Sequence, residues 1–223
     1  MFISKTRPLV VPQSEHLHLS GTLALLWGNG DFDAPPFDPL SVVSGVGQHD
    51  RGYGVLDNSP IGKMEEAEWF AIARRGFETQ CADPVADLIA RFHIRRLARH
   101  GDTPERTALS AEFGDEILRQ LESGGYSQEL FDRMDRITEL CDRISFAFCF
   151  EEPARGRVEI YPRNAREATE GVEFRVAGPE IGVSPWPFSV REYSGYITGY
   201  LLDGYPDELK PVVLPYRLSR ESW

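Results

Sequence analysis

The stretch RITELCDRISFAFCFEEPARGRVEIYPR, Arg136–Arg163, contains the change of pattern on which the predicted fold depends. Up to Phe150 its apolar residues lie around almost the whole circumference of a helix, which indicates a deeply buried helix. From Glu151 onward apolar and polar residues alternate, as is typical of strands with one buried face. We therefore expect a helical part of the chain to end, and a β-rich part to begin, close to Glu151.

The chain upstream of this stretch has the signals of further helices. Asp-Pro pairs at Asp38 and Asp83 place an N-cap residue before a proline at the first helical position, and so predict two helix starts. The N-terminal segment 1–11 alternates loosely and predicts a strand or hairpin. The other helices are expected over about 14–27, 65–75, 104–121 and 127–148.

These patterns together predict a mostly α fold in one domain, residues 1–223. The expected architecture is a helical core over about 13–150 and a small antiparallel β elaboration. That elaboration combines the N-terminal strand, about 1–12, with the C-terminal tail, 151–223.

Net charge, apolar runs and cysteine spacing argue against several classes of function. The net charge of −11 disfavours non-specific nucleic-acid binding. No apolar run approaches the roughly 20 residues that span a bilayer, and the N-terminus lacks the apolar core of a signal peptide. The three cysteines have no CxxC spacing, so we expect reduced thiols, a cytoplasmic protein and no zinc-thiolate site.

A His-Asp pair ends the helix that begins after Asp38. His49 and Asp50 follow Val46 by three and four residues, so both side chains are expected on the buried side of that helix. A buried aspartate is costly unless it is paired or metal-bound. Two interpretations stay open from this segment alone: a metal site, or a helix-end aspartate beside an ordinary core histidine.

Two later polar residues also occupy apolar helical settings. His93 continues the apolar stripe of its helix, and either a core histidine or an active-site residue fits that position. Asp142 lies in the buried helix of the opening stretch, so it needs strong compensation. Its partner could be Arg143, Arg136 or a metal ion shared with the histidines. His100, at a helix end, is better explained as a cation near the helix C-terminus.

The ordered set His16, His49-Asp50 and Asp142 resembles the H…HD…D pattern of the HD-domain superfamily of helical, metal-dependent phosphohydrolases and some oxygenases. A closer resemblance is to a bacterial family, the domain-of-unknown-function 3891 family. The segments that carry it are EHLHLSGTLALLWGN, QHDRGYGVLDNSP, LIARFHIRRL, CDRISFAFC and VSPWPF. The resemblance selects His16 rather than His18 as the first member of the set.

The resemblance implies a divalent transition metal, which is Mn, Fe, Ni, Co or Zn, held by His16, His49, Asp50 and Asp142. One ion is expected, and His93 leaves open the possibility that a second ion binds. Asp50 would also orient a water nucleophile, His93 would contact the leaving group or phosphate, and Arg51 would neutralise phosphate charge. Tyr53 stands where many HD phosphohydrolases carry a lysine.

The expected function is hydrolysis of a small phosphoester or nucleotide-like substrate by a metal-activated water. The alternatives are a non-catalytic metal- or ligand-binding regulator and an oxygenase with a di-iron site. The expected partner is a small molecule, phosphorylated or not, and no membrane partner is expected. Whether the chain forms a homo-oligomer is left open. In the tail, SPWPF, Ser184–Phe188, is either a structural plug or the wall of a pocket for a planar ligand.

Overall fold

The computed structural model describes residues 1–53, 60–165 and 168–222. Part of the QHDRGYGVLDNSP segment, residues 54–59, therefore lies outside the described residues. Six α-helices occur in the described part of the chain: α1 (Gln13–Leu25), α2 (Pro39–Val46), α3 (Glu66–Glu78), α4 (Pro84–Ala98), α5 (Pro104–Gly124) and α6 (Gln128–Phe150). A short 3-10 helix covers Arg51–Tyr53. None of the described helices is long and apolar enough to cross a bilayer.

Local sequence explains where α2 and α4 begin. The Asp38 carboxylate accepts the Leu40 N–H at 2.9 Å, and the Asp83 carboxylate accepts the N–H groups of Val85 and Ala86. Each aspartate is followed by proline, whose missing N–H would have no partner within the first helical turn. The N-caps predicted from the Asp-Pro pairs are confirmed.

The strands form one seven-stranded sheet in the order β1-β2-β6-β7-β5-β4-β3. Their bounds are β1 (Phe2–Ile3), β2 (Leu9–Val11), β3 (Arg155–Ile160), β4 (Glu170–Ala177), β5 (Glu180–Ser184), β6 (Glu192–Leu201) and β7 (Pro211–Ser219). Neighbouring strands are antiparallel, except that β5 and β7 are parallel. The β1–β2 hairpin joins the tail because β2 pairs with β6.

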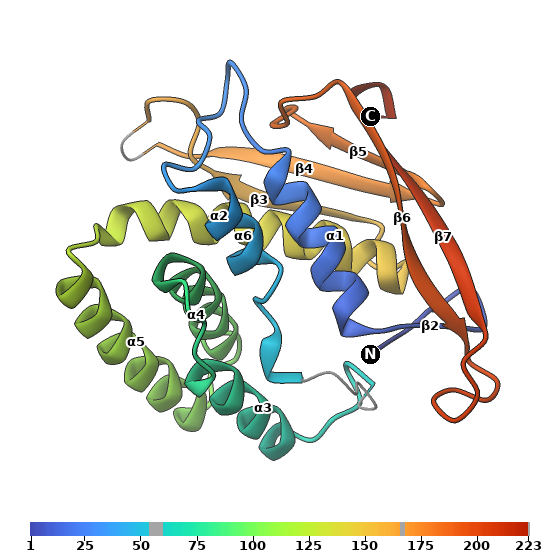
Figure 1. Ribbon diagram of the computed structural model, residues 1–223, viewed down its shortest axis with the longest axis horizontal. Helices are drawn as coiled ribbons and strands as arrows, with labels where there is room; N and C mark the ends of the chain where they lie inside the picture. Colours follow the sequence, from blue (N-terminus) through green and yellow to red (C-terminus); the bar gives the residue numbers. More distant parts are fainter. Residues whose placement is uncertain (54–59, 166–167, 223) are drawn as a thin grey trace.

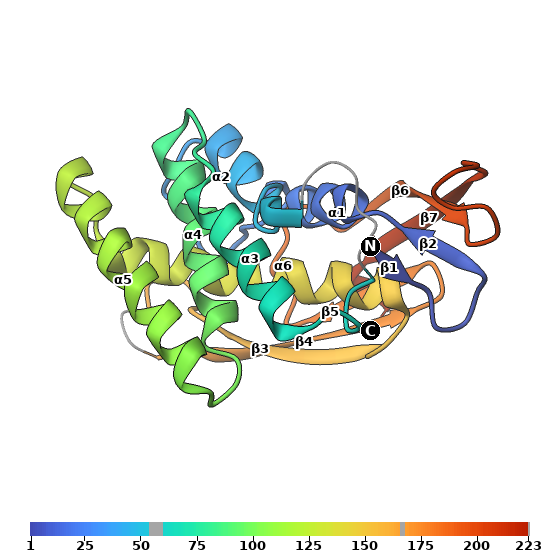
Figure 2. The ribbon, with the colours of Figure 1, turned by 90° about the horizontal axis from the view of Figure 1, so that it is seen from below.

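Helix α6 occupies the centre of the molecule. It contacts β3 and β4 on one side and α1 and α4 on the other, and Figure 2 shows it lying along the sheet with the remaining helices beyond it. Figure 1 shows α3, α4 and α5 grouped away from the sheet. This central position explains why the C-terminal half of α6 is buried around nearly its whole circumference: its buried residues include Leu140, Ile144 and Phe148.

The expectation of a mostly α, HD-like helical core with a small antiparallel β elaboration is wrong. The structure is an α/β fold with 46% helix, 21% strand and a curled, mixed seven-stranded sheet. The alternating pattern after Glu151 is present, and β4 buries every second residue. What the pattern does not contain is the pairing between strands. Strand β7 lies between β6 and β5 and pairs with β5 in parallel, which makes one wide sheet out of what we expected to be a small elaboration.

The SPWPF segment lies against the chain at the C-terminal end of α1, where the Gly28 N–H donates to the Pro187 carbonyl at 2.9 Å. Trp186 is 7% exposed and packs edge-on against Phe188. The indole N–H of Trp186 donates to the Val190 carbonyl at 2.8 Å, and the Asn29 side chain donates to the Trp186 carbonyl at 2.6 Å. These contacts favour the structural plug over the pocket wall.

Candidate metal centre

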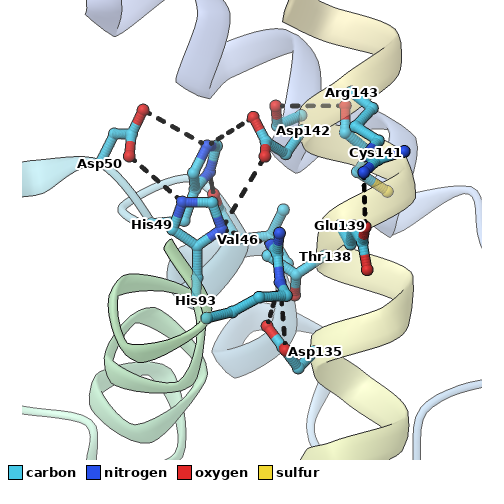
Figure 3. Close-up of polar contacts among 12 residues, drawn as sticks. Val46, His49, Asp50, His93, Asp135, Thr138, Glu139, Cys141, Asp142 and Arg143 are labelled. Atoms are coloured by element: carbon cyan, nitrogen blue, oxygen red, sulfur yellow. Dashed lines mark hydrogen bonds and ion pairs between the residues drawn. The ribbon is translucent and has the colours of Figure 1, made fainter. Parts of the chain in front are cut away.

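Five polar side chains from four parts of the chain meet between the helices. His16 lies on α1, His49 and Asp50 follow α2, His93 lies on α4 and Asp142 on α6. Figure 3 shows Asp50 and Asp142 on opposite sides of the imidazoles of His49 and His93. The three histidines are fully buried. The structure therefore brings together all four residues expected as metal ligands, and His93 with them.

Contacts between α1 and α6 place His16 beside Asp142. The Ser145 hydroxyl donates to the backbone carbonyl of His16 at 2.8 Å, and both side chains are buried. One turn away on each helix, the Ser20 hydroxyl lies 3.5 Å from the Cys141 carbonyl. Small polar side chains at these points let the two helices approach closely enough for His16 to reach the carboxylate of Asp142.

A close approach of α2 to α4 places His49 beside His93. A Cβ atom at Gly45 would lie 2.7 Å from Cβ of Ile89 and 3.0 Å from the Ala86 carbonyl oxygen, so only glycine fits there. The ring centroids of His49 and His93 are consequently 4.4 Å apart. Gly52 has a similar role after the His-Asp pair, because a Cβ atom there would lie 2.2 Å from the Ile72 carbonyl oxygen.

Four of the ligand atoms converge on one point. Nε2 of His16 lies 3.0 Å from Nε2 of His49 and 3.3 Å from Oδ1 of Asp142. Nε2 of His49 lies 3.5 Å from the same Asp142 oxygen. Oδ2 of Asp50 is 3.9 Å from Nε2 of His16 and 3.8 Å from Nε2 of His49.

These separations fit the coordination shell of a transition-metal ion. Ligands about 2.1 Å from an ion lie about 3.0 Å apart at right angles and about 3.4 Å apart at tetrahedral angles. The three distances among His16, His49 and Asp142 are 3.0, 3.3 and 3.5 Å. Asp50 is a few tenths of an ångström further out and completes the group. The residues therefore fit a divalent ion with imidazole and carboxylate ligands.

In the described part of the chain, two groups of three side chains have this metal-binding spacing: His16, His49 and Asp142, and His49, Asp50 and His93. They share His49, whose Nδ1 lies 2.6 Å from the Val46 carbonyl oxygen. Since a carbonyl only accepts, Nδ1 carries the hydrogen and only Nε2 has a lone pair. His49 can therefore serve one ion, and the two groups cannot each use it at the same time.

The charges of the cluster favour cation binding. Burial opposes ionisation of Asp50, but His49 and the hydrogen bond from His93 outweigh it and lower the pKa of Asp50 to about 2. Burial likewise opposes ionisation of Asp142, and hydrogen bonds from His16 and His49 hold its pKa well below the ordinary value. Both carboxylates are thus ionised near neutral pH, although they are largely buried.

The pKa values of His49 and His93 are shifted in opposite directions. Burial would lower the pKa of His49, but Asp50 and Asp142 raise it above 6.5. Burial, together with His49 and Arg96, lowers the pKa of His93. Of these two histidines, His49 is therefore the one whose surroundings favour the protonated form.

A cavity of about 370 Å³ opens onto the cluster. Asp50, His93 and Asp142 line one part of it. Its other walls are mainly apolar or aromatic and include Phe2, Ile61, Met64, Trp69, Leu97 and Phe146. Tyr53, which stands where many HD phosphohydrolases carry a lysine, also lines the cavity.

One arginine lines this cavity within the described residues, and its guanidinium is engaged. Nε of Arg106 binds the Glu66 carboxylate at 2.7 Å, and Nη1 donates to the His100 carbonyl at 2.7 Å. The guanidinium also lies over the Trp69 ring, 4.2 Å from its centroid. Arg106 therefore shapes the wall of the cavity and has its charge balanced by Glu66.

Arg51 does not join the cluster. Its Nε donates to the Gly76 carbonyl at 2.7 Å, and its Nη2 lies 2.8 Å from the Asp87 carboxylate. These contacts fasten the turn after Asp50 to α3 and α4. The arginines considered as partners of Asp142 are also engaged elsewhere, since Arg136 and Arg143 both pair with Glu139. His18 and His100 are exposed and outside the cluster.

Two residues next to the cluster were missed in the sequence. The Gln13 side-chain amide donates to Oδ2 of Asp50 at 2.7 Å, and Nη2 of Arg96 lies 2.7 Å from Nδ1 of His93. Each stands three residues from a histidine of the cluster, Gln13 before His16 and Arg96 after His93, and so shares its helix face. That three-residue spacing is the feature of the sequence from which both residues could have been predicted.

Comparison with known proteins gives a single finding. A family model with the description "Protein of unknown function (DUF3891)" matches residues 3–203. That range contains the whole cluster, together with Gln13 and Arg96. No curated protein and no solved structure matches the chain.

Proposed function

The chain belongs to the DUF3891 family, and from that premise we propose that it is a metal-dependent hydrolase acting on a small phosphoester or nucleotide-like substrate. The observation that carries the proposal is the convergence of His16, His49, Asp50 and Asp142 at spacings of 3.0 to 3.9 Å. The ligands follow the H…HD…D order of the HD-type hydrolases, and that resemblance is the reason for proposing hydrolysis.

The ligand set indicates the class of ion. Two imidazoles with two carboxylates suit Mn, Fe, Co, Ni or Zn better than Ca or Mg. When bound, such an ion polarises a phosphoryl oxygen and lowers the pKa of a water molecule toward neutrality. The proposal requires one ion, because His49 has a lone pair on Nε2 alone.

The chain's own side chains have separate tasks in this proposal. The imidazoles of His16 and His49 and the carboxylate of Asp142 would hold the ion. Asp50 would be a further ligand, and the Gln13 amide and His93 would fix its orientation through hydrogen bonds of 2.7 and 3.2 Å. A carboxylate held at both oxygens keeps a fixed position, from which it would orient the attacking water molecule.

The cavity beside the cluster would hold the substrate. Its apolar and aromatic walls suit a substrate with a compact apolar or planar body that leaves its scissile group against Asp50 and Asp142. Since the pairing with Glu66 balances Arg106, the bound ion would supply most of the positive charge for a phosphoryl group.

The test is a phosphatase and nucleotidase screen of the metal-free chain reconstituted separately with Mn, Fe, Co, Ni and Zn. We expect metal-dependent turnover of at least one small phosphoester. Asp50→Asn should lower kcat by at least about 100-fold, since it removes a charged ligand of the ion that also orients the water. The matched control is Asp203→Asn, a change at an exposed position in the loop between β6 and β7. Activity that survives Asp50→Asn unchanged would refute the assigned role.

A second candidate is a metal-dependent ligand-binding regulator without turnover. The observation that favours it is the engagement of both Arg51 and Arg106 by carboxylates, which leaves little free positive charge for a transferred phosphoryl group. Thermal stability separates the two candidates. A chain that turns over no substrate, yet gains stability from a nucleotide only when metal is bound, would be a regulator.

The affinity for metal should fall as the pH decreases. The pKa of His49 is raised above 6.5 in the metal-free chain, so the proton persists on His49 to higher pH than on a free histidine, and the ion must displace it. Below that pKa we expect about a tenfold loss of affinity per pH unit, with the loss beginning above pH 6.5. Competition with a chromophoric chelator across this range measures it, and a pH-independent affinity would contradict the assignment of His49 as a ligand.

A further inference from the structure

A buried chain of hydrogen bonds leads from the cluster to a charged pair on α4 and α6, the helices that carry His93 and Asp142. Nη2 of Arg96, on α4, lies 2.7 Å from Nδ1 of His93. Nε of the same guanidinium lies 3.1 Å from each carboxylate oxygen of Asp135, on α6. The Arg96 and Asp135 side chains are only 12% and 14% exposed, and Figure 3 shows Asp135 on the same side of α6 as the cluster.

The chemistry of the guanidinium fixes the hydrogens of His93. Arginine has five N–H donors and no acceptor. Nδ1 of His93 must therefore accept, so the ring hydrogen of the neutral imidazole is located on Nε2. Nε2 then donates to Oδ1 of Asp50, 3.2 Å away. The only other polar contact of Nδ1 within the described residues is Oδ2 of Asp142, at 4.0 Å, which is beyond hydrogen-bond length.

His49 has the opposite arrangement. Its Nδ1 faces a carbonyl oxygen, which forces a hydrogen onto Nδ1 and leaves Nε2 as the nitrogen that can present a lone pair to an ion. Nδ1 of His16 has no hydrogen-bond partner among the described residues, so the His16 ring can also present a lone pair at Nε2. The two groups of three side chains are thus unequal. In one, both histidines can turn an Nε2 lone pair toward an ion that displaces any proton held there, whereas in the other His93 presents a hydrogen.

We propose that Arg96, held by Asp135, is a positioning residue that fixes His93 as the Nε2–H tautomer and so makes it a hydrogen-bond donor to Asp50 and not a metal ligand. The consequence for the metal rests on the proposed function, whereas the tautomer is a property of the metal-free chain. The ion is then held by His16, His49 and Asp142 with Asp50. A second ion at His93 is excluded as long as Arg96 is in place.

Nitrogen-15 NMR of histidine-labelled, metal-free protein tests the tautomer directly. In the wild type we expect the His93 ring with Nδ1 unprotonated and Nε2 protonated, and the His49 ring with Nδ1 protonated; His93→Gln supplies the assignment. In Arg96→Met the constraint on Nδ1 is lost and the Nδ1–H form of His93 should become populated. Arg96→Lys, which keeps a donor, should retain the wild-type form. An Nδ1–H tautomer of His93 in the wild type would overturn the proposal, whether or not the chain binds metal.

Cobalt binding tests the consequence for the ion. His93→Gln keeps a donor to Asp50, so we expect its cobalt affinity to stay within about tenfold of the wild type, with an unchanged visible spectrum. Arg96→Met should change the cobalt spectrum as a nitrogen of His93 enters the shell, and the Arg96→Met/His93→Gln double variant should not show that change. The double variant Arg96→Met/Asp135→Leu removes the buried charge left by Arg96→Met and covers the case in which the single variant is unstable. Equal losses of affinity in His93→Gln and His49→Gln would overturn the proposal, because His93 would then be a ligand.

Discussion

His49→Gln should abolish stoichiometric metal binding. The side chain keeps a similar size and polarity but loses the Nε2 lone pair that lies 3.0 Å from His16 and 3.5 Å from Asp142. Loss of an outer-shell partner alone typically costs 10–100-fold in metal affinity, so the loss of a ligand should cost at least about 100-fold. Metal analysis of untagged protein, followed by calorimetric titration with zinc or cobalt, measures the effect.

The control for this variant is His18→Gln. His18 lies on α1, two residues from His16, but it is exposed and outside the cluster, so its replacement should leave metal content and affinity unchanged. Circular dichroism and thermal melting of the metal-free proteins separate loss of a ligand from loss of the fold. Wild-type metal content in folded His49→Gln would contradict the assignment of His49 as a ligand.

Asp142→Asn should weaken metal binding and also destabilise the metal-free chain. The carboxylate lies 3.3 Å from His16 and 3.5 Å from His49, and hydrogen bonds that involve a charged group contribute about 1.5–3 kcal/mol. We expect a decrease of about 1–3 kcal/mol in the free energy of unfolding near neutral pH. Because the pKa of Asp142 is lowered in the folded state, this contribution is present above the ordinary aspartate pKa and is lost as the pH falls below it.

Urea unfolding of the metal-free proteins at several pH values measures this difference. The gap between wild type and Asp142→Asn should narrow as the pH falls below the ordinary aspartate pKa of 3.8. Asp132 on the same helix provides the matched control, because burial and the neighbouring Asp135 raise its pKa. Asp132→Asn should therefore cause no loss of stability near neutral pH. If the wild type and Asp142→Asn have the same free energy of unfolding near neutral pH, the carboxylate does not stabilise the cluster.

The residues of the cluster were accessible from the sequence because helical periodicity is a local property. His49 and Asp50 continue the apolar face of α2, and Asp142 lies in a segment that is apolar on nearly every side. A buried carboxylate in such a segment requires a partner, and the ordered resemblance pointed to histidines. Periodicity did not distinguish His16 from His18; the resemblance did, and in the structure His16 is buried while His18 is exposed.

The extent of the sheet could not be predicted from local periodicity. Alternation identifies a strand but not its neighbour, and the pairs that enlarge this sheet are distant in sequence. Strands β2 and β6 pair although most of the sequence separates them, and β7 lies between β6 and β5. The contacts of Arg51 were hidden for the same reason. Its partners, Gly76 and Asp87, come from α3 and α4, so only the packing of those helices decides that the guanidinium binds there.

The most direct test of the metal centre is a crystal structure of the metal-loaded chain with anomalous diffraction recorded on both sides of the metal absorption edge. We predict one anomalous peak per chain, about 2.0–2.3 Å from Nε2 of His16, Nε2 of His49 and a carboxylate oxygen of Asp142. Asp50 should complete the shell, and Nε2 of His93 should remain hydrogen-bonded to it. A structure in which these side chains converge without a peak between them, from crystals grown with excess metal, would contradict the account.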